Sequence, residues 1–340
     1  MTGTAEQDSA VRKGEPAVPK ADPAELYRTV RLIRRFEQRA IDLVRRGVIP
    51  GGIHPYLGQE AIAAGVCAAL RDDDLITSTH RGHGHVLAKG SDPVRMLAEL
   101  AGRETGLNSG RGGSMHAADV GVGIYGANAI VGAAAAIATG AAWWHRQAGR
   151  DLVAVTFFGD GAVNQGVLLE ALNLASLWQA PVLFVCENNG FATSMRVADS
   201  TAGSIVGRAA AFGIPAETVD GMDAEVVLAA AGRAVDRARS GGGPTLLECL
   251  TYRFDAHHTW EYLARPRYRT PEEVAEGSVR DPVELQGERV GDTVRAGIDA
   301  EIEELLDRAV EFAQDSPHPD PAGALDHLYA DGLRARAGLR

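Results

Sequence analysis

The sequence predicts an α/β fold with a mainly parallel sheet flanked by helices. Residues 152–158 and 182–187 are short apolar runs rich in β-branched and aromatic residues, which is typical of parallel strands buried on both faces. The segment between them, residues 166–178, has the apolar period of a helix, and Pro181 follows it as a stop signal. The three segments therefore predict one strand–helix–strand unit.

The same succession recurs nearer the C-terminus. Residues 214–219 and 245–252 have the composition of strands, and residues 223–239 between them have that of a helix. This repetition supports parallel pairing. The other predicted elements, in chain order, are helices at 24–46 and 58–70, a strand at 75–79, a helix at 92–101, a glycine-rich loop at 106–126, a small-residue helix at 129–144 and a charged helix outside the core at 287–315.

The chain length favours one large α/β domain with extensions. With 340 residues, the chain can bury a sizeable core. We predict a flexible N-terminal tail at residues 1–23, a ligand-binding α/β domain at 24–285, and a C-terminal helical extension and tail at 286–340.

Composition excludes several classes of partner. The formal net charge of −11, without any basic block, argues against nucleic acid. No apolar run reaches the ~20 residues that cross a bilayer, and the N-terminus lacks the apolar segment of a signal peptide. Cys67, Cys186 and Cys249 lie in apolar contexts without Cys-x-x-Cys spacing, which fits buried thiols in a reducing compartment. We therefore expect a cytoplasmic protein that binds neither membrane nor nucleic acid.

Polar turns follow both strands of the first unit. Gly-Asp-Gly occupies 159–161, and Asn-Asn occupies 188–189. The carboxyl ends of parallel strands meet at one sheet edge, where open α/β folds bind ligands. Carboxylate and carboxamide oxygens suit Mg²⁺, and small residues at Gly161 and Ala162 leave room for backbone to approach a diphosphate. The pattern predicts a site for magnesium and a diphosphate, although Asp160 alone could be only a helix cap.

Seven collinear segments between residues 54 and 254 extend this pattern, and the resemblance that they carry covers roughly residues 24–285. With them the chain resembles the alpha subunit of the decarboxylating (E1) component of 2-oxo acid dehydrogenase complexes, in the pyruvate and acetoin dehydrogenase group. The matching segments are HPYLGQEA (54–61), LITSTHRGHGHVLAKG (75–90), GRGGSMH (110–116), GANAIVGA (126–133), FFGDGAVNQG (157–166), CENNGFATS (186–194) and TYRF (251–254).

The resemblance implies thiamine diphosphate and Mg²⁺ as cofactors. It assigns the metal to Asp160, the Asn189 side chain and the Phe191 backbone carbonyl. Arg81 could reach a phosphate through charge-assisted hydrogen bonds, or could be a solvated surface arginine. The cofactor-binding residues expected on this basis are His80, Arg81, Ala129, Ile130, Val131, Asp160, Gly161, Ala162, Asn189 and His257.

Three histidines are candidates for catalysis. His54, His83 and His257 could transfer protons or hold a substrate carboxylate, because imidazole titrates near neutral pH. A single histidine is more often structural. His257 matches the second histidine of a His-Gly-His loop in the resembled family, whose first two positions are replaced here. His80 and His83 both lie in the predicted loop after residue 79. His80 stands where pyruvate dehydrogenases commonly have tyrosine, and this difference favours the acetoin branch.

The resemblance also implies a partner chain. In such enzymes the glutamate that activates the cofactor belongs to a beta subunit, so we expect an α2β2 heterotetramer that is inactive without beta. The expected activity is an oxidoreductase that decarboxylates a pyruvate-like 2-oxo acid or cleaves acetoin and transfers the acyl unit to a lipoyl domain of an acyltransferase. A carboligase that uses an aldehyde or ketone acceptor is the alternative. A non-catalytic regulatory subunit is least favoured, because the residues predicted to bind the metal and the phosphates are present.

Overall fold

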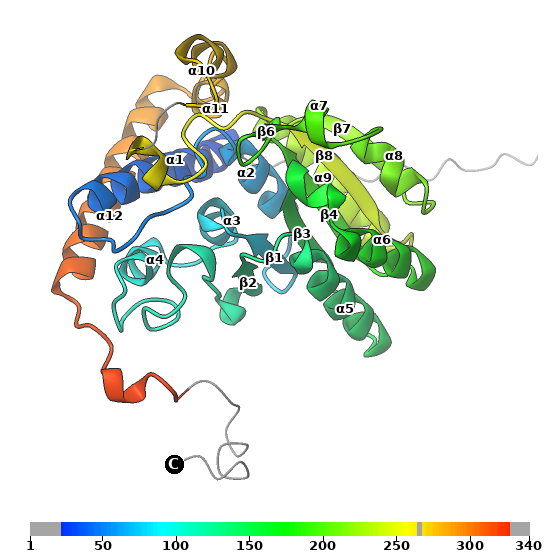
Figure 1. Ribbon diagram of the computed structural model, residues 1–340, viewed down its shortest axis with the longest axis horizontal. Coiled ribbons are helices and arrows are strands. Elements are labelled where there is room, and N and C mark those ends of the chain that lie inside the picture. Colours follow the sequence, from blue (N-terminus) through cyan, green and yellow to red (C-terminus); the bar gives the residue numbers. More distant parts are fainter. Residues whose placement is uncertain (1–21, 264–266, 327–340) are drawn as a thin grey trace, which may run out of the picture.

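A six-stranded parallel sheet forms the centre of the protein (Figure 1). The computed structural model describes residues 22–263 and 267–326. The strand order is β2-β1-β3-β4-β8-β7, and every neighbouring pair is parallel. The predicted fold class is confirmed. In sheet order the strands are β2 (Ile124–Asn128), β1 (Leu75–Thr79), β3 (Ala154–Gly159), β4 (Val182–Asn188), β8 (Thr245–Leu250) and β7 (Ala216–Asp220).

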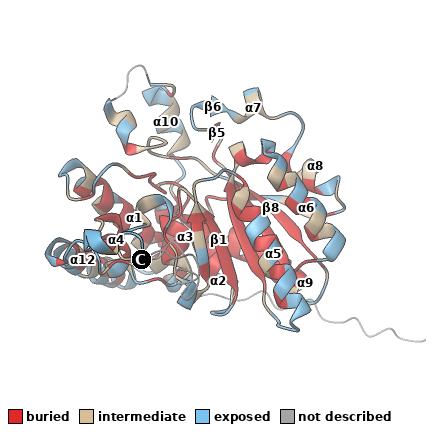
Figure 2. Cartoon of the chain, turned by 60° about the horizontal axis from the view of Figure 1, so that its bottom comes forward, coloured by how far each residue is buried: buried red, intermediate tan, exposed pale blue. Residues whose placement is uncertain are grey.

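Helices cover both faces of this sheet, so that its strands are buried (Figure 2). Because side chains alternate along a strand, Val155 and Phe157 of β3 enter one core, whereas Ala154 and Phe158 enter the other. The first core includes residues of α1 (Pro23–Arg45), α2 (Glu60–Ala68), α4 (Pro93–Leu100), α9 (Ala224–Arg239) and α12 (Asp292–Asp315), and the second includes residues of α5 (Ala133–Gln147), α6 (Gly166–Trp178) and α8 (Ile205–Ala210).

Two predicted loops contain regular structure. The loop after residue 79 includes α3 (His83–Ala88), and the glycine-rich segment 106–126 contains the start of β2. Neither has a long apolar period, because α3 is six residues long and β2 is an edge strand whose Tyr125 is exposed. The remaining elements are η1 (Gly113–Met115), η2 (Val120–Val122), η3 (Asp160–Asn164), β5 (Phe191–Ala192), β6 (Met195–Arg196), α7 (Val197–Ser200), η4 (Thr259–Leu263), α10 (Pro271–Gly277), α11 (Pro282–Gly287) and η5 (Pro321–Gly323).

The expectation that the charged C-terminal helix lies outside the core is wrong. Ile298, Ile302 and Leu306 of α12 are buried in the first core, on the face that packs against α1 and α4. Their spacing of four residues places them on one side of the helix. The proposed domain boundary at 285/286 stays a prediction. The predicted N-terminal tail, residues 1–23, lies outside the described residues apart from residues 22 and 23.

No helix in the described ranges combines the length and apolar composition needed to cross a membrane. Cys67, Cys186 and Cys249 are all buried and free, as their apolar contexts suggested.

Candidate active site

A cavity of about 250 Å³ lies at the carboxyl ends of β1, β3 and β4. The chain goes from β1 to β2 on one side and returns to β3 on the other, so β1 and β3 flank the point where the strand order reverses. Open α/β sheets bind ligands at this position. The turns after the three strands and the segment after β8 supply the charged and polar lining, which includes His80, Arg81, Asp160, Asn189, Arg253 and His257.

Asp160 begins η3 directly after β3 and is only 2% exposed. Its Oδ2 atom is buried and has no hydrogen-bond partner among the described residues. Burial raises the pKa of this carboxyl to about 6, although backbone N–H groups of Gly161 and Gly190 favour the charged form. Because a buried carboxylate oxygen without a partner is costly, this atom is suited to a bound cation.

Asn189 follows β4 and faces the same cavity. Its Nδ2 donates to Oε1 of Gln59 at 2.8 Å, and its Oδ1 accepts from the backbone N–H of Phe191 at 3.2 Å. These two bonds fix the orientation of the amide. The structure therefore brings a carboxylate and a carboxamide from successive turns to one cavity, a donor set that fits Mg²⁺.

Close packing explains the glycine at position 161. A Cβ atom there would lie 2.8 Å from the Cβ of Ala192, in the β5–β6 hairpin. Phe191 in the same hairpin lines the cavity, as does Ala162. Gly161 thus permits the hairpin to cover the turn that carries Asp160.

Two buried guanidinium groups face the cavity. Arg81 donates to the carbonyl oxygen of Pro55 at 2.6 Å and to that of His257 at 3.1 Å. Arg253, which is 1% exposed, donates to the carbonyl of Thr193 at 3.1 Å and to the Tyr268 hydroxyl.

Neither Arg81 nor Arg253 pairs with a carboxylate within the part of the chain that the structure describes. Burial lowers the pKa of Arg81 to about 9, and the charge of Arg253 acts in the same direction. Two such cations favour an anionic ligand. Sequence reasoning missed Arg253, although it lies in the matching segment 251–254.

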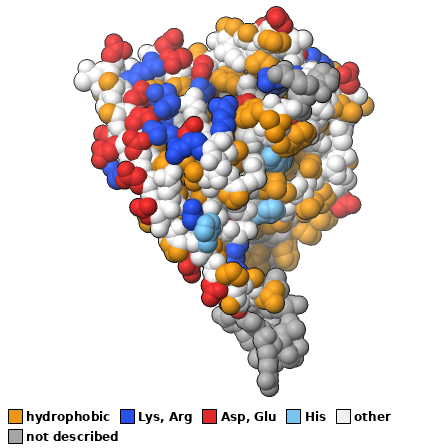
Figure 3. All heavy atoms as spheres, turned by 60° about the vertical axis from the view of Figure 1, so that its left-hand side comes forward, with side chains coloured by type: hydrophobic (Ala, Val, Ile, Leu, Met, Phe, Trp, Pro, Cys, Tyr) orange, Lys and Arg blue, Asp and Glu red, His pale blue; other side chains and the backbone are white. Residues whose placement is uncertain are grey.

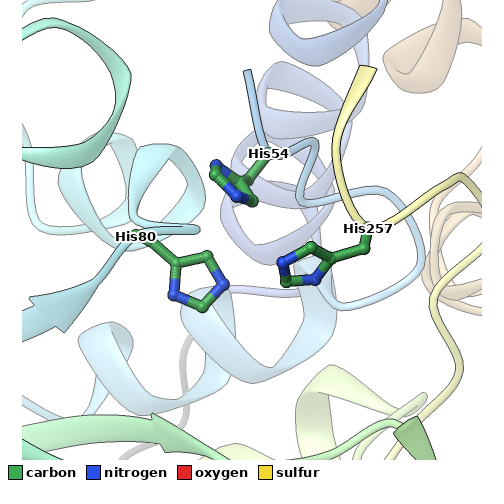
Figure 4. Close-up of side chains that lie close together, drawn as sticks. All are labelled: His54, His80 and His257. Carbon is green, nitrogen blue, oxygen red and sulfur yellow. The ribbon is translucent and has the colours of Figure 1, made fainter. Parts of the chain in front are cut away.

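Histidine rings from three distant segments meet beside this cavity (Figure 4). The ring centroids of His54 and His80 are 4.6 Å apart, those of His54 and His257 4.9 Å, and those of His80 and His257 5.3 Å. Burial, with a further contribution from Arg81, lowers the pKa of His80 to about 3 and that of His257 to about 2. The pKa of His54 is also lowered, chiefly by burial. The three imidazoles are therefore uncharged at neutral pH.

Comparison with known proteins identifies the family. The sequence matches the dehydrogenase E1 component family over residues 28–322. The chain belongs to this family. It is 44% identical to the alpha subunit of acetoin:2,6-dichlorophenolindophenol oxidoreductase from Bacillus subtilis, over 89% of the chain and 92% of that relative. The corresponding protein from Cupriavidus necator is 45% identical over 97% and 99%. Pyruvate dehydrogenase E1 component subunit alpha from Rhizobium meliloti is 41% identical over 92% and 90%.

The chain is accordingly an E1 chain of the alpha-subunit type, from a family that uses thiamine diphosphate. The resemblance predicted from the seven sequence segments is confirmed. The roles of individual residues in this E1 chain stay predictions, for which the geometry gives unequal support.

His83 receives the least support among the predicted catalytic residues. It lies in α3, outside the cavity lining, with its Nδ1 3.0 Å from Oε1 of Glu37 and its Nε2 2.9 Å from Oγ of Ser114. Both nitrogens are thus occupied. The structure brings His54 and His257 together, but it holds His83 in a separate buried network.

The predicted cofactor-binding residues 129–131 lie in an exposed turn beside the cavity. Ile130 and Val131, in the turn between β2 and α5, line the cavity, and Ile130 is 70% exposed. Ala129 is half-buried in the same turn but is not part of the lining. This wall of the cavity consists of apolar side chains that also face outward.

A buried polar network beneath the cavity was not predicted. The Tyr56 hydroxyl donates to Oε1 of Glu187, and His85 Nε2 lies 3.1 Å from the same oxygen. His85 Nδ1 lies 2.8 Å from Oγ of Ser78. The network links the ends of β1 and β4 with α3. Its members are scattered in sequence, so no local pattern indicates that they meet.

Proposed function

We propose that this E1 chain is the alpha subunit of a thiamine diphosphate- and Mg²⁺-dependent enzyme that cleaves acetoin or decarboxylates a small 2-oxo acid. The acyl unit would pass to a lipoyl domain of an acyltransferase partner. The observation that carries the proposal is the buried Asp160 oxygen that has no partner within residues 22–263 and 267–326. Its cavity also contains two buried guanidinium groups that pair with no carboxylate in those ranges. These groups complement a divalent cation and a diphosphate.

In this proposal Asp160, the Asn189 side chain and the Phe191 carbonyl hold Mg²⁺. Arg81 and Arg253 provide positive charge for the diphosphate, and the cofactor when bound supplies carbanion chemistry at a carbonyl carbon. The family membership and the donor set of the cavity support these assignments. His80, Ile130, Val131, Gly161 and Ala162 complete the cofactor-facing wall as lining residues.

The neutral histidines favour acetoin among the two substrates. Acetoin has a hydroxyl and a carbonyl but no charge. Uncharged His54 and His257 can accept a proton from a hydroxyl group or donate an N–H to a carbonyl oxygen. A carboxylate is better held by a cation, and in this proposal the two lining arginines, Arg81 and Arg253, are used by the diphosphate. The acetoin oxidoreductase alpha subunits at 44% and 45% identity support the same choice.

An exposed apolar surface supports pairing with a beta subunit. The surface begins at Ile130 beside the cavity and continues along α5 and α6 with Ile137, Trp144, Leu177 and Trp178, all of which are exposed. Exposed apolar patches adjoining a site mark protein interfaces. We propose that beta packs here in an α2β2 assembly and contributes the activating glutamate, because Glu187, the one glutamate among the described lining residues, is held in the buried network with Tyr56 and His85.

The experiment is to co-express the chain with its beta partner and supply either acetoin or pyruvate. Dye reduction and mass spectrometry of an added lipoyl domain are the measurements. Substrate-dependent acylation of the lipoyl domain supports the proposal. A C–C coupled product with an aldehyde acceptor instead assigns the carboligase activity. Full turnover by the chain alone contradicts the subunit assignment, and failure to bind thiamine diphosphate even with beta indicates a non-catalytic subunit.

A further inference from the structure

His54, His80 and His257 form a cluster with the spacing of metal ligands. One ring nitrogen from each side chain lies within 4.8 Å of the other two. The rings come from the segment before α2, the end of β1 and the segment after β8, and Figure 4 shows them facing a common space. The Nδ1 atom of His54 is buried and has no hydrogen-bond partner among the described residues.

The chemistry of three imidazoles differs from that of the Asp160 site. Neutral imidazole nitrogen suits Zn²⁺, Ni²⁺ and Cu²⁺, whereas Mg²⁺ prefers oxygen ligands. In a tetrahedral zinc site with Zn–N bonds of about 2.0–2.1 Å, the nitrogens are about 3.4 Å apart. The rings therefore need to approach one another by about 1.4 Å at most, which side-chain rotation can supply. The lowered pKa values described above keep the lone pairs free.

Arg81 limits the ways in which His257 can bind a metal. Its guanidinium donates to His257 Nδ1 at 3.1 Å and to the His257 carbonyl oxygen at 3.1 Å. Because Arg81 occupies the lone pair of Nδ1, ligation uses Nε2. This moves the ring proton to Nδ1 and breaks the Arg81–Nδ1 bond, while Arg81 keeps its bonds to the carbonyl oxygens of His257 and Pro55. The charges of Arg81 and of nearby Arg253 weaken cation binding, so the site is expected to be weaker than a structural zinc site.

We propose that His54, His80 and His257 bind one borderline divalent cation, such as Zn²⁺, through their ring nitrogens. Because His80 and His257 also line the cavity, the bound ion obstructs the entry of thiamine diphosphate. His80 is decisive, since a tyrosine at this position, as in the pyruvate dehydrogenases that the chain resembles, leaves only two imidazoles. The cation site itself does not depend on the proposed reaction. Its effect on the cofactor rests on the proposed function.

The first test measures the cation alone. The tag-free full chain is titrated with Zn²⁺ by calorimetry in excess Mg²⁺, and with Co²⁺ followed by visible absorption. We expect one Zn²⁺ per chain and the intense bands of tetrahedral Co²⁺. His80→Tyr should weaken Zn²⁺ binding at least ~10-fold, since even loss of an outer partner of a metal ligand has an effect of that size.

Two variants control this test. His116→Gln removes an exposed imidazole outside the cluster and should leave Zn²⁺ affinity unchanged. Asp160→Ala removes the proposed magnesium ligand and should also retain Zn²⁺ binding. Absence of Zn²⁺ binding, or equal affinity in His80→Tyr whose circular dichroism matches the parent, overturns the proposed site.

The second test measures competition on the complex with beta. Zn²⁺ should weaken thiamine diphosphate binding in the parent protein and should have a smaller effect in His80→Tyr, when each variant is compared with itself with and without the ion. Unchanged cofactor affinity of the parent in Zn²⁺ overturns the competition. If the complex binds Zn²⁺ but never binds thiamine diphosphate, the proposed function and the competition fail, whereas the cation site stands.

Discussion

Charged side chains are paired with opposite charges at the α1–α12 interface but are left without such partners, among the described residues, in the candidate active site. At the interface each arginine of α1 that faces α12 has a carboxylate partner, and Figure 3 shows basic and acidic side chains intermixed on the side of the molecule where these helices lie. In the cavity, Arg81 and Arg253 have no carboxylate partner, and Asp160 Oδ2 has no hydrogen-bond partner, among the described residues. The interface pairs are Arg28–Glu301, Arg31–Asp299, Arg35–Glu303, Arg39–Glu303 and Arg39–Asp307.

This difference indicates that the paired charges stabilise the fold, whereas the unpaired buried charges bind a ligand. Half-exposed ion pairs contribute little each but cost little desolvation, so a helix interface can use many of them. Buried charges without counter-charges lower stability unless a ligand completes them. Buried charged groups without counter-charges are therefore a stronger indication of a ligand-binding site than the presence of charged residues alone.

The largest expected effect concerns Asp160. Asp160→Ala removes the carboxylate whose Oδ2 has no partner among the described residues, and we expect Mg²⁺-dependent thiamine diphosphate affinity to fall at least ~100-fold, the upper range for loss of an outer partner of a metal ligand. Calorimetry on the complex with beta measures it, with Glu303→Gln as the control that should bind normally. Equal affinity of Asp160→Ala and the parent would remove Asp160 from the metal site.

The next effect tests the buried cation that sequence reasoning missed. Arg253→Met should weaken thiamine diphosphate binding by about 10–100-fold, because a charge-assisted hydrogen bond contributes about 1.5–3 kcal/mol. The measurement is the same titration. Arg35→Met, which removes a paired arginine at the α1–α12 interface, should bind the cofactor normally. If both variants bind normally, Arg253 acts only through its bonds to Thr193 and Tyr268.

A smaller effect is expected at the interface. Glu303 accepts from both Arg35 and Arg39, and Glu303→Gln should reduce the free energy of unfolding by about 0.5–1 kcal/mol at low salt. Urea unfolding at low and high ionic strength measures it, and the difference should shrink as salt screens the pairs. A loss that is independent of salt would indicate packing rather than charge as the cause.

The smallest effect is a pH dependence at the same residue, because solvent screens this part-exposed carboxyl and reduces what its pKa shift contributes to stability. Hydrogen bonds from Arg35, followed by the other contacts with Arg35 and Arg39, lower the pKa of Glu303 from 4.5 to about 2. A carboxyl whose pKa falls on folding stabilises the protein above its unfolded pKa, and this contribution is lost as pH falls from about 4.5 through 2. Glu303→Gln should therefore show a shallower loss of stability in that window. Parallel stability curves for parent and variant would contradict the assignment.

Local sequence patterns predicted the elements with both faces buried. The helix predicted at 166–178 coincides with α6, and the strands around it are β3 and β4, because burial on both faces demands continuous apolar runs. The edge strand β2 was missed because only Ile124 and Ala127 of it are buried, and α3 was missed because its six residues are too few for a helical period and include the polar His83 and His85. The burial of α12 was missed because charges on its exposed face obscure the apolar stripe of Ile298, Ile302 and Leu306.

The candidate site was predicted only where a motif marks it. The turns that carry Asp160 and Asn189 follow recognisable strands, and both line the cavity. His83 lies within a matching segment and yet points into a separate network with Glu37. Motif membership places a residue near the site but does not direct its side chain.

The sequence by itself determined the parallel α/β fold, the family and the two turns that offer oxygen ligands. The period of apolar residues and the order of motifs are local properties, so they can be read along the chain. Only the tertiary structure decided that Arg253 joins Arg81 and that His54, His80 and His257 converge. These contacts join segments far apart in sequence, and their protonation depends on burial, which exists only after the chain has folded.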